Sequence, residues 1–217
     1  MYVSELNTLL DEYHLLKHPF YIAWTEGRID RTILRDYAEQ YYHHVKAFPR
    51  YISATHSLCE DSKSRKMLLE NLVEEESSND HDHPALWRQF ATELESTDPD
   101  NTTPDKHTSE MIDNFFKWAR SSYAEGLASL YTYERQVPEV ADVKIDGLKK
   151  FYGVRSKEGL QFFEVHRGAD VQHRKDCEEL LDALSPEEKE LAKQSALTTA
   201  KYLWNFLTGI CEKHNIH

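Results

Sequence analysis

Three side chains able to bind a metal ion recur at helical spacing in one segment, as His166, Asp170 and His173. Offsets of four and seven residues turn a helix by about 400° and 700°, so these side chains would form one stripe. Imidazole and carboxylate ligands at such spacing suit iron, manganese or zinc. Because the surrounding residues are strongly charged, a solvated polar face is the alternative interpretation.

A second group combines three consecutive glutamates, Glu74, Glu75 and Glu76, with two histidines, His81 and His83. The glutamates end a helical pattern, where acidic side chains oppose the helix macrodipole and therefore add little stability. Glu75 continues the apolar stripe of that helix, which favours an inward side chain. A solvated acidic helix end with surface histidines is the alternative.

A third carboxylate, Glu134, ends the strongly apolar run ASLYTYE. It follows Leu130 by one helical turn and Tyr131 by three residues, so its side chain can point into a helical bundle. A buried carboxylate needs a metal ion, a cation or hydrogen bonds, whereas an exposed glutamate needs none of these. Carboxylates and histidines from three helices of one bundle are the parts of a dinuclear metal site, although the paired Glu-x-x-His motifs of ferritin-like bundles are absent.

The elements that would position these side chains are all helical. Apolar residues recur with the helical period almost throughout, and no alternating strand pattern occurs. Asp30 and Ser156 are suitable N-caps, and Ser185 to Glu188 forms a capping box with proline at the first helical position. Pro49 is expected to kink or break a long helix, and residues 95–108 resemble a surface loop. We therefore expect an all-α bundle of about seven or eight helices.

Length and composition limit the class of protein. The 217 residues suit a single domain over residues 1–217. A formal net charge of −12 argues against a nucleic-acid-binding protein and against a polybasic membrane anchor. The three cysteines form no CxxC pair and indicate neither a disulfide framework nor a zinc knuckle. With no signal-peptide pattern and no long apolar run, we expect a soluble cytoplasmic protein without a membrane partner.

Several blocks of the chain together are similar to the haem-oxygenase-like dimetal oxidases. More narrowly, they resemble the CADD-like proteins (after the Chlamydia protein associating with death domains), in the group that includes pyrroloquinoline-quinone synthase C and the TenA-type proteins. The blocks are HLLKHPFYIAW (14–24), DYAEQYYHHVKAFPRYISATHS (36–57), NLVEEE…HDHPALW (71–87), ASLYTYERQVPEVADVKIDGL (128–148) and FFEVHRGADVQH (162–173). The resemblance implies a haem-oxygenase-like bundle and six metal ligands, which fall on Glu75, His83, Glu134, His166, Asp170 and His173.

The assignment of the first two ligands stays open at the level of sequence. The family usually has six residues between its first glutamate and first histidine, whereas seven separate Glu75 from His83. The pairs Glu76–His83 and Glu74–His81 would each have six. The HPALW run favours His83, and the helical register favours Glu75.

The resemblance also implies an activity. CADD-like proteins make para-aminobenzoate, a folate precursor, with dioxygen, a reductant, two metal ions (Fe/Fe or Fe/Mn) and a tyrosine of their own chain. The matching residues are Tyr21 as the ring source, Tyr37 as a second tyrosine near the site and Lys144 as the source of nitrogen. Without the resemblance, both tyrosines would be interpreted as core residues and Lys144 as a surface lysine. A homodimer is expected for this fold.

Three other functions compete with this one. A pyrroloquinoline-quinone-synthase-C-like oxidase would act on an external small molecule without metal, which the proposed ligand set disfavours. A thiamine-degrading enzyme of the same fold would need a nucleophilic cysteine, but Cys59, Cys177 and Cys211 lie in no matching block. A non-catalytic protein that binds death domains is the third, and no residue pattern in the chain supports it.

Overall fold

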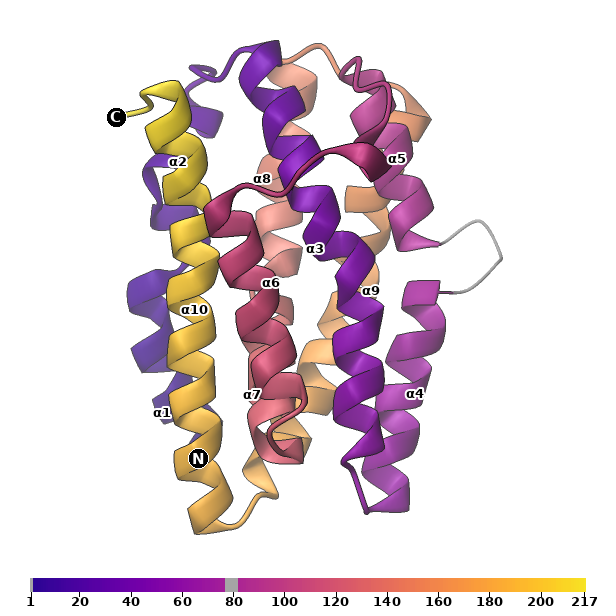
Figure 1. Cartoon of the computed structure of the whole chain (residues 1–217), viewed down its shortest axis with the longest axis vertical. Helices are drawn as coiled ribbons and strands as arrows, with labels where there is room; N and C mark the ends of the chain where they lie inside the picture. Colours follow the sequence, from indigo (N-terminus) through magenta and orange to yellow (C-terminus); the bar gives the residue numbers. More distant parts are fainter. Residues whose placement is uncertain (1, 77–81) are drawn as a thin grey trace.

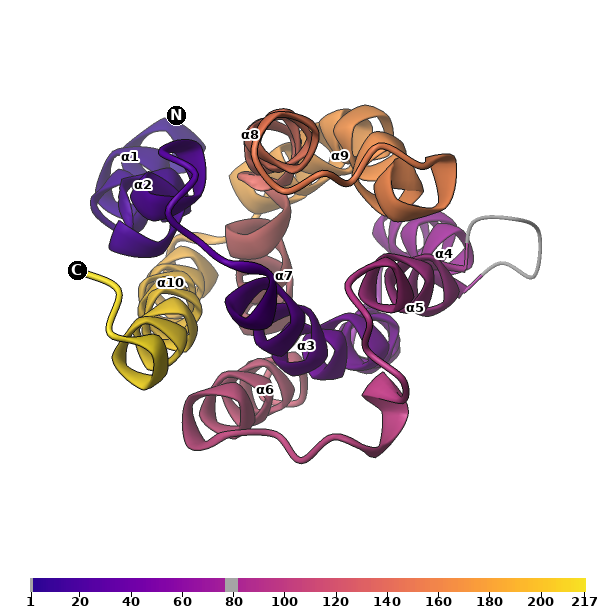
Figure 2. The ribbon, with the colours of Figure 1, turned by 90° about the horizontal axis from the view of Figure 1, so that it is seen from above.

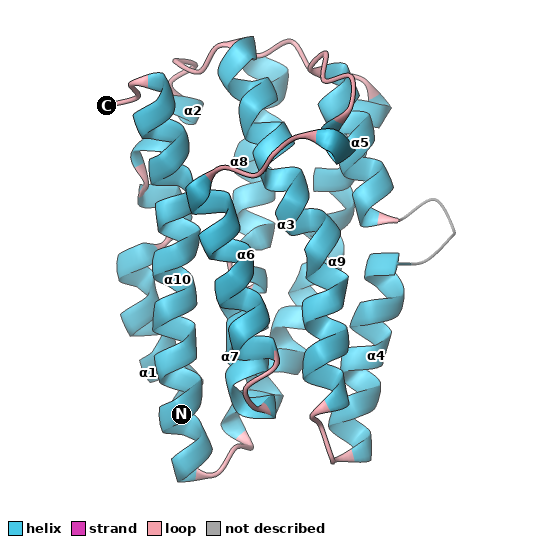
Figure 3. Ribbon diagram, in the orientation of Figure 1, coloured by secondary structure: helices cyan, strands magenta, loops and turns pink. Residues whose placement is uncertain are grey.

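The computed structural model describes residues 2–76 and 82–217, except for the side chains of residues 168–173. Within this part every regular element is helical, which confirms the all-α expectation (Figure 1 and Figure 3). The α-helices are α1 (Tyr2–Leu10), α2 (Pro19–Thr25), α3 (Arg31–Ser57), α4 (Ser62–Glu76), α5 (His83–Glu93), α6 (Lys106–Ala119), α7 (Tyr123–Glu134), α8 (Val137–Lys150), α9 (Lys157–Asp182) and α10 (Pro186–His214). Short 3-10 helices lie at Asp11–Tyr13, Leu15–Lys17 and Pro99–Asn101.

Among the described residues there are ten α-helices, more than the expected seven or eight, and one of them is the short α2. Helix α1 ends at Leu10 and two 3-10 turns follow it, so the chain turns before α2 begins at Pro19. The His18 side chain accepts a hydrogen bond from the Phe20 N–H and caps this short helix. This short helix matters for the site, because it carries Tyr21 into the core.

Three predicted helix starts are confirmed by their caps. The Asp30 side chain accepts from the backbone N–H of Ile33, and Ser156 caps α9 in the same way. Ser185 and Glu188 form the predicted capping box at the start of α10. Each cap satisfies backbone donors that the first turn of a helix leaves without partners.

The expected interruption at Pro49 is wrong as a break, because α3 is one helix from Arg31 to Ser57 with Pro49 inside it. A proline within a helix costs about 3 kcal/mol. Its neighbours Phe48, Tyr51 and Ile52 are all buried. Burying each such side chain stabilises the fold by roughly 1.5–3 kcal/mol, which outweighs the cost.

Helix α3 lies in the middle of the bundle and packs against α4, α5, α6 and α7. Helix α9 packs against α5, α7 and α8, so α3, α5, α7, α8 and α9 surround a common centre (Figure 2). The indole N–H of Trp87 on α5 donates to the carbonyl of Ala38 on α3 at 2.7 Å. This arrangement brings segments far apart in sequence to one interior. In the described part of the chain, no helix is long and apolar enough to cross a bilayer.

The contact between α3 and α7 depends on Gly126. A Cβ at this position would lie 2.4 Å from Oγ1 and 2.9 Å from Cγ2 of the fully buried Thr55. We expect Gly126→Ala to lower the free energy of unfolding by about 1–3 kcal/mol, because the core cannot accept the added methyl group without moving. Urea denaturation measures this change. A more stable variant would contradict the contact, since alanine alone stabilises a helix interior by roughly 0.5–1 kcal/mol.

Candidate metal centre

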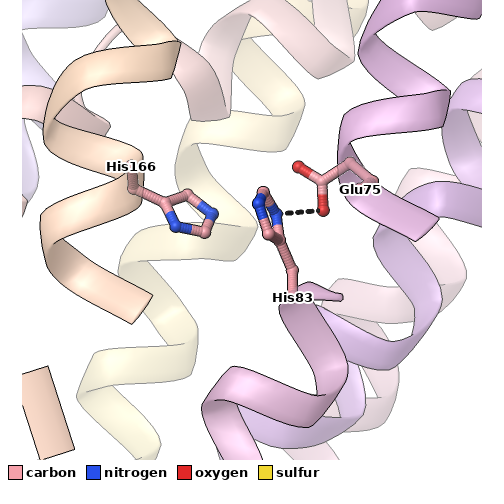
Figure 4. Close-up of side chains that lie close together, drawn as sticks. All are labelled: Glu75, His83 and His166. Atoms are coloured by element: carbon pink, nitrogen blue, oxygen red, sulfur yellow. Dashed lines mark hydrogen bonds and ion pairs between the residues drawn. The ribbon is translucent and has the colours of Figure 1, made fainter. Parts of the chain in front are cut away.

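Three predicted ligands from three helices meet in the interior: Glu75 of α4, His83 of α5 and His166 of α9 (Figure 4). Each offers one ligand atom, and these atoms lie within 4.8 Å of one another. The side chains are buried, with exposed fractions of 4%, 1% and 3%. Two imidazoles and one carboxylate are the donor set typical of non-haem iron, so the residues present fit a metal ion.

Hydrogen bonds orient these three groups. The Nδ1 of His83 lies 2.7 Å from Oε2 of Glu75. The Nδ1 of His166 donates to the carbonyl of Phe162 at 2.7 Å, which leaves the lone pair of the neutral ring on Nε2. A histidine that ligates a metal ordinarily donates its other ring nitrogen in this way. His166 is therefore prepared to bind through Nε2.

Local sequence explains why His83 begins α5. The Asp82 side chain accepts from the N–H of Ala85 at 2.8 Å, and Pro84 occupies the first turn. The cap and the proline start the helix at His83, whose ring centroid lies 4.2 Å from that of His166. Among the three glutamates, Glu75 is buried, whereas Glu74 and Glu76 are exposed. The burial favours Glu75 with His83 over the two alternative pairs, although His81 lies outside the described residues.

Glu134 is buried at the end of α7 but is not one of the three clustered groups. Its Oε1 accepts from Nδ2 of Asn71 at 2.7 Å, and its Oε2 accepts from Sγ of Cys177 at 3.4 Å. Burial raises the pKa of the Cys177 thiol well above its usual range, so the thiol keeps its proton. The two remaining predicted ligands, Asp170 and His173, belong to α9, but their side chains lie outside the described residues.

A buried lysine lies next to this region. Lys144 of α8 is 4% exposed, so its interpretation as a surface lysine from pattern alone is wrong. Its Nζ lies 4.9 Å from the ring centroid of Tyr41, 5.3 Å from that of Tyr37 and 6.0 Å from that of Tyr21. Loss of hydration on burial lowers the pKa of Lys144 to about 7. Much of this lysine is therefore a neutral, nucleophilic amine at neutral pH.

The tyrosines around Lys144 are protonated phenols. Burial raises the pKa of Tyr21 and of Tyr37 well above the usual value, and each phenol also influences the other. The Tyr37 hydroxyl is buried and makes no hydrogen bond of ordinary geometry with any described residue. The Tyr41 hydroxyl donates to that of Tyr133 at 3.0 Å. The predicted pair, Tyr21 and Tyr37, thus lies with Lys144 in one aromatic interior.

A cavity of about 20 Å³ connects the two regions. Its lining includes Tyr21, Tyr41 and Lys144 as well as Phe162 and His166. A space of this size holds about one molecule as small as water. Lys144, Tyr21 and the predicted metal ligand His166 therefore share one small interior space.

Two residues that sequence reasoning did not select, Asn71 and Cys177, contact the predicted ligand Glu134. The positions of both residues relative to the predicted ligands could have indicated them. Asn71 lies one helical turn before Glu75, and Cys177 lies eleven residues after His166 on the same helix. Both positions continue a ligand stripe, because residues separated by whole turns share a helix face.

Comparison with known proteins assigns the chain to a class. The family model for iron-containing redox enzymes matches residues 35–204, so the chain belongs to this family of oxidoreductases. It is 38% identical to a 4-aminobenzoate synthase of Chlamydia pneumoniae, over 96% of this chain and 94% of the relative. It is 37% identical to a 4-aminobenzoate synthase of Nitrosomonas europaea, over 97% and 91%. Within the redox enzymes, the chain belongs to the 4-aminobenzoate (para-aminobenzoate) synthase family.

The fold comparison agrees with this assignment. The structure matches the crystal structure of a domain of unknown function with a haem-oxygenase-like fold from Shewanella denitrificans, with a TM-score of 0.81. The match covers 98% of this chain and 91% of the other at 15% sequence identity. It confirms the expected haem-oxygenase-like fold.

Proposed function

We propose that residues 1–217 form one haem-oxygenase-like domain that makes 4-aminobenzoate from dioxygen and a tyrosine of its own chain. Glu75, His83 and His166 would hold metal together with Glu134, Asp170 and His173, as an Fe/Fe or Fe/Mn pair. When bound, the metal ions supply electrons and open positions for dioxygen, with an external reductant restoring the electrons. The observation that carries the proposal is the burial of Lys144 beside Tyr21.

The residues of the chain have separate roles in this reaction. Tyr21 provides the ring, its Cα–Cβ bond breaks, and its Cβ becomes the carboxyl carbon of the product. Lys144 provides the nitrogen, and its amine is neutral because burial lowers its pKa. Once dioxygen has oxidised the ring, this amine condenses with the ring carbon that bears the phenol oxygen, and that oxygen leaves as water. Hydrolysis of the rearranged imine then breaks the Cε–Nζ bond, so the nitrogen stays on the ring and the lysine side chain ends as an aldehyde. The Tyr37 hydroxyl is buried close to Tyr21. It keeps its proton because burial raises its pKa.

The size of the cavity supports a substrate that is already part of the chain. Sites for external small molecules typically enclose about 300–1,000 Å³. The space between Lys144 and His166 measures about 20 Å³. It suits dioxygen beside a side chain that is already in place, and it disfavours the external small-molecule substrate of the rival oxidase.

Mass spectrometry after one reaction tests the proposal. Protein loaded with iron is given dioxygen and a reductant, and the product and the peptide of residues 14–24 are analysed together. We expect about one product molecule or fewer per chain and a lesion at Tyr21, because the ring cannot be replaced. Tyr21→Phe should make no product, whereas Tyr13→Phe, in a half-buried tyrosine outside the cavity lining, should behave as the parent. Product formed with intact Tyr21 would show that the ring comes from elsewhere.

A further inference from the structure

The Glu134 carboxylate is bound on both of its oxygens by side chains from two other helices. Nδ2 of Asn71 on α4 donates to Oε1 at 2.7 Å, and Sγ of Cys177 on α9 donates to Oε2 at 3.4 Å. All three side chains are buried. The orientation of Glu134 is therefore set by contacts that solvent does not weaken.

The two donors come from the helices that carry the other ligands. Asn71 lies one turn before Glu75 on α4, and Cys177 lies about three turns after His166 on α9. A shift of Glu134 relative to Glu75 or His166 would stretch at least one of these hydrogen bonds. The contacts therefore couple the end of α7 to both ligand-bearing helices.

The environment of Asn71 indicates a role beyond stability. Its Oδ1 is buried and has no hydrogen-bond partner among the described residues. An unsatisfied buried acceptor costs about 1–3 kcal/mol, which an apolar side chain of similar size would avoid. A cavity of about 10 Å³ beside it is lined by Met67, Leu68 and Leu180 together with Asp176 and Cys177. The unpaired oxygen of the Asn71 amide therefore destabilises the fold, whereas its Nδ2 donates to Glu134.

We propose that Asn71 and Cys177 are positioning residues that hold the Glu134 carboxylate in the orientation required for metal binding. A carboxylate has about four lone-pair sites, so the two hydrogen bonds from Asn71 and Cys177 do not by themselves prevent metal binding. Groups that orient a ligand in this way typically contribute 10–100-fold to metal affinity. The inference rests on the proposed function, because it takes Glu134 as a ligand.

Metal binding by the metal-free protein tests the inference without measuring product. Fe(II) or Mn(II) is titrated anaerobically against a competing chelator, which yields the stoichiometry and the affinity of each site. Cys177→Ala and Asn71→Leu each remove one donor, and we expect each to weaken one metal site about 10–100-fold. Cys177→Ser retains a donor and should remain within a few-fold of the parent. Cys211→Ala, in a buried cysteine on α10, is the matched control and should leave binding unchanged.

The outcomes separate this inference from the proposed function. If Glu134→Gln loses a metal ion while folded Cys177→Ala and Asn71→Leu bind as the parent does, Glu134 is a ligand and the positioning role is wrong. If Glu134→Gln binds metal like the parent, both the ligand assignment and the positioning role fail. Circular dichroism and thermal melting establish that each variant is folded. Should Cys177→Ala not fold, Cys177→Val and Asn71→Leu remove the same donors, and parental affinity in either would overturn the inference.

Discussion

His83→Ala is expected to abolish metal binding at the centre and, with it, formation of 4-aminobenzoate. The ring is one of three clustered ligand groups, and its loss removes a nitrogen donor. Loss of a group that merely orients a ligand costs 10–100-fold in affinity, so loss of the ligand should cost more than about 100-fold. Metal content after anaerobic loading and product per chain measure the two effects.

The same substitution should also destabilise the metal-free protein. Glu75 is 4% exposed, and its carboxylate would lose the partner that lies at 2.7 Å. A buried polar group left unsatisfied costs about 1–3 kcal/mol, so the midpoint of urea unfolding should fall.

A second buried histidine provides the matched control. His44 is fully buried among aromatic rings, and neither of its ring nitrogens has a hydrogen-bond partner among the described residues. His44→Phe should leave metal content unchanged and should not lower stability, because it removes unpaired polar atoms from an apolar site. A His83→Ala protein that loads metal as fully as His44→Phe would contradict the proposed centre.

Lys144→Met is expected to eliminate 4-aminobenzoate formation while stabilising the fold. Methionine has a similar length and no charge to bury, so the core should accept it. Protein labelled with ¹⁵N at the lysine side chains should yield ¹⁵N-labelled product, and the variant should yield none. Unlabelled product from the labelled parent, or parental yield from Lys144→Met, would exclude Lys144 as the nitrogen source.

The stabilisation by Lys144→Met should depend on pH. The pKa of Lys144 is about 7 in the folded protein against 10.5 for the ordinary side chain, so between these values the unfolded chain binds more protons. As the pH rises from about 7 towards 9.5, the parent should therefore gain stability relative to the variant. The buried cysteine thiols, whose pKa values burial raises, contribute an opposing slope that is common to both proteins. At pH 7 the free energy of unfolding of the variant should exceed that of the parent by on the order of a few kcal/mol. Urea unfolding at pH 7 and pH 9 measures both; a parent and variant with equal slopes would contradict the buried charge.

The helical class and several boundaries could be predicted because they depend on neighbours in sequence. Asp30, Ser156 and Ser185 cap helices through hydrogen bonds to residues three positions away. The helical period of the apolar residues can be recognised within the sequence of a single helix. Pro49 was expected to kink or break the helix; a break is wrong, because packing around α3 outweighs the local cost of proline.

The candidate site was predictable in part for the same reason. The inward direction of Glu75 follows from the register of its own helix, and the structure buries it while Glu74 and Glu76 remain exposed. The direction of Glu134 likewise follows from Leu130 and Tyr131 in α7. Helical spacing thus indicated which carboxylates point inward, but it contained no information on which helices are neighbours.

The sequence by itself determined the helical class, the inward direction of Glu75 and Glu134 and, through resemblance, the family. Only the tertiary structure decided that His166 lies beside Glu75 and His83, that Asn71 and Cys177 hold Glu134, and that Lys144 is buried among tyrosines. The physical reason is that periodicity is a property of one helix. Desolvation, a lowered lysine pKa and a buried cluster of candidate metal ligands arise only where several helices exclude water from the same space.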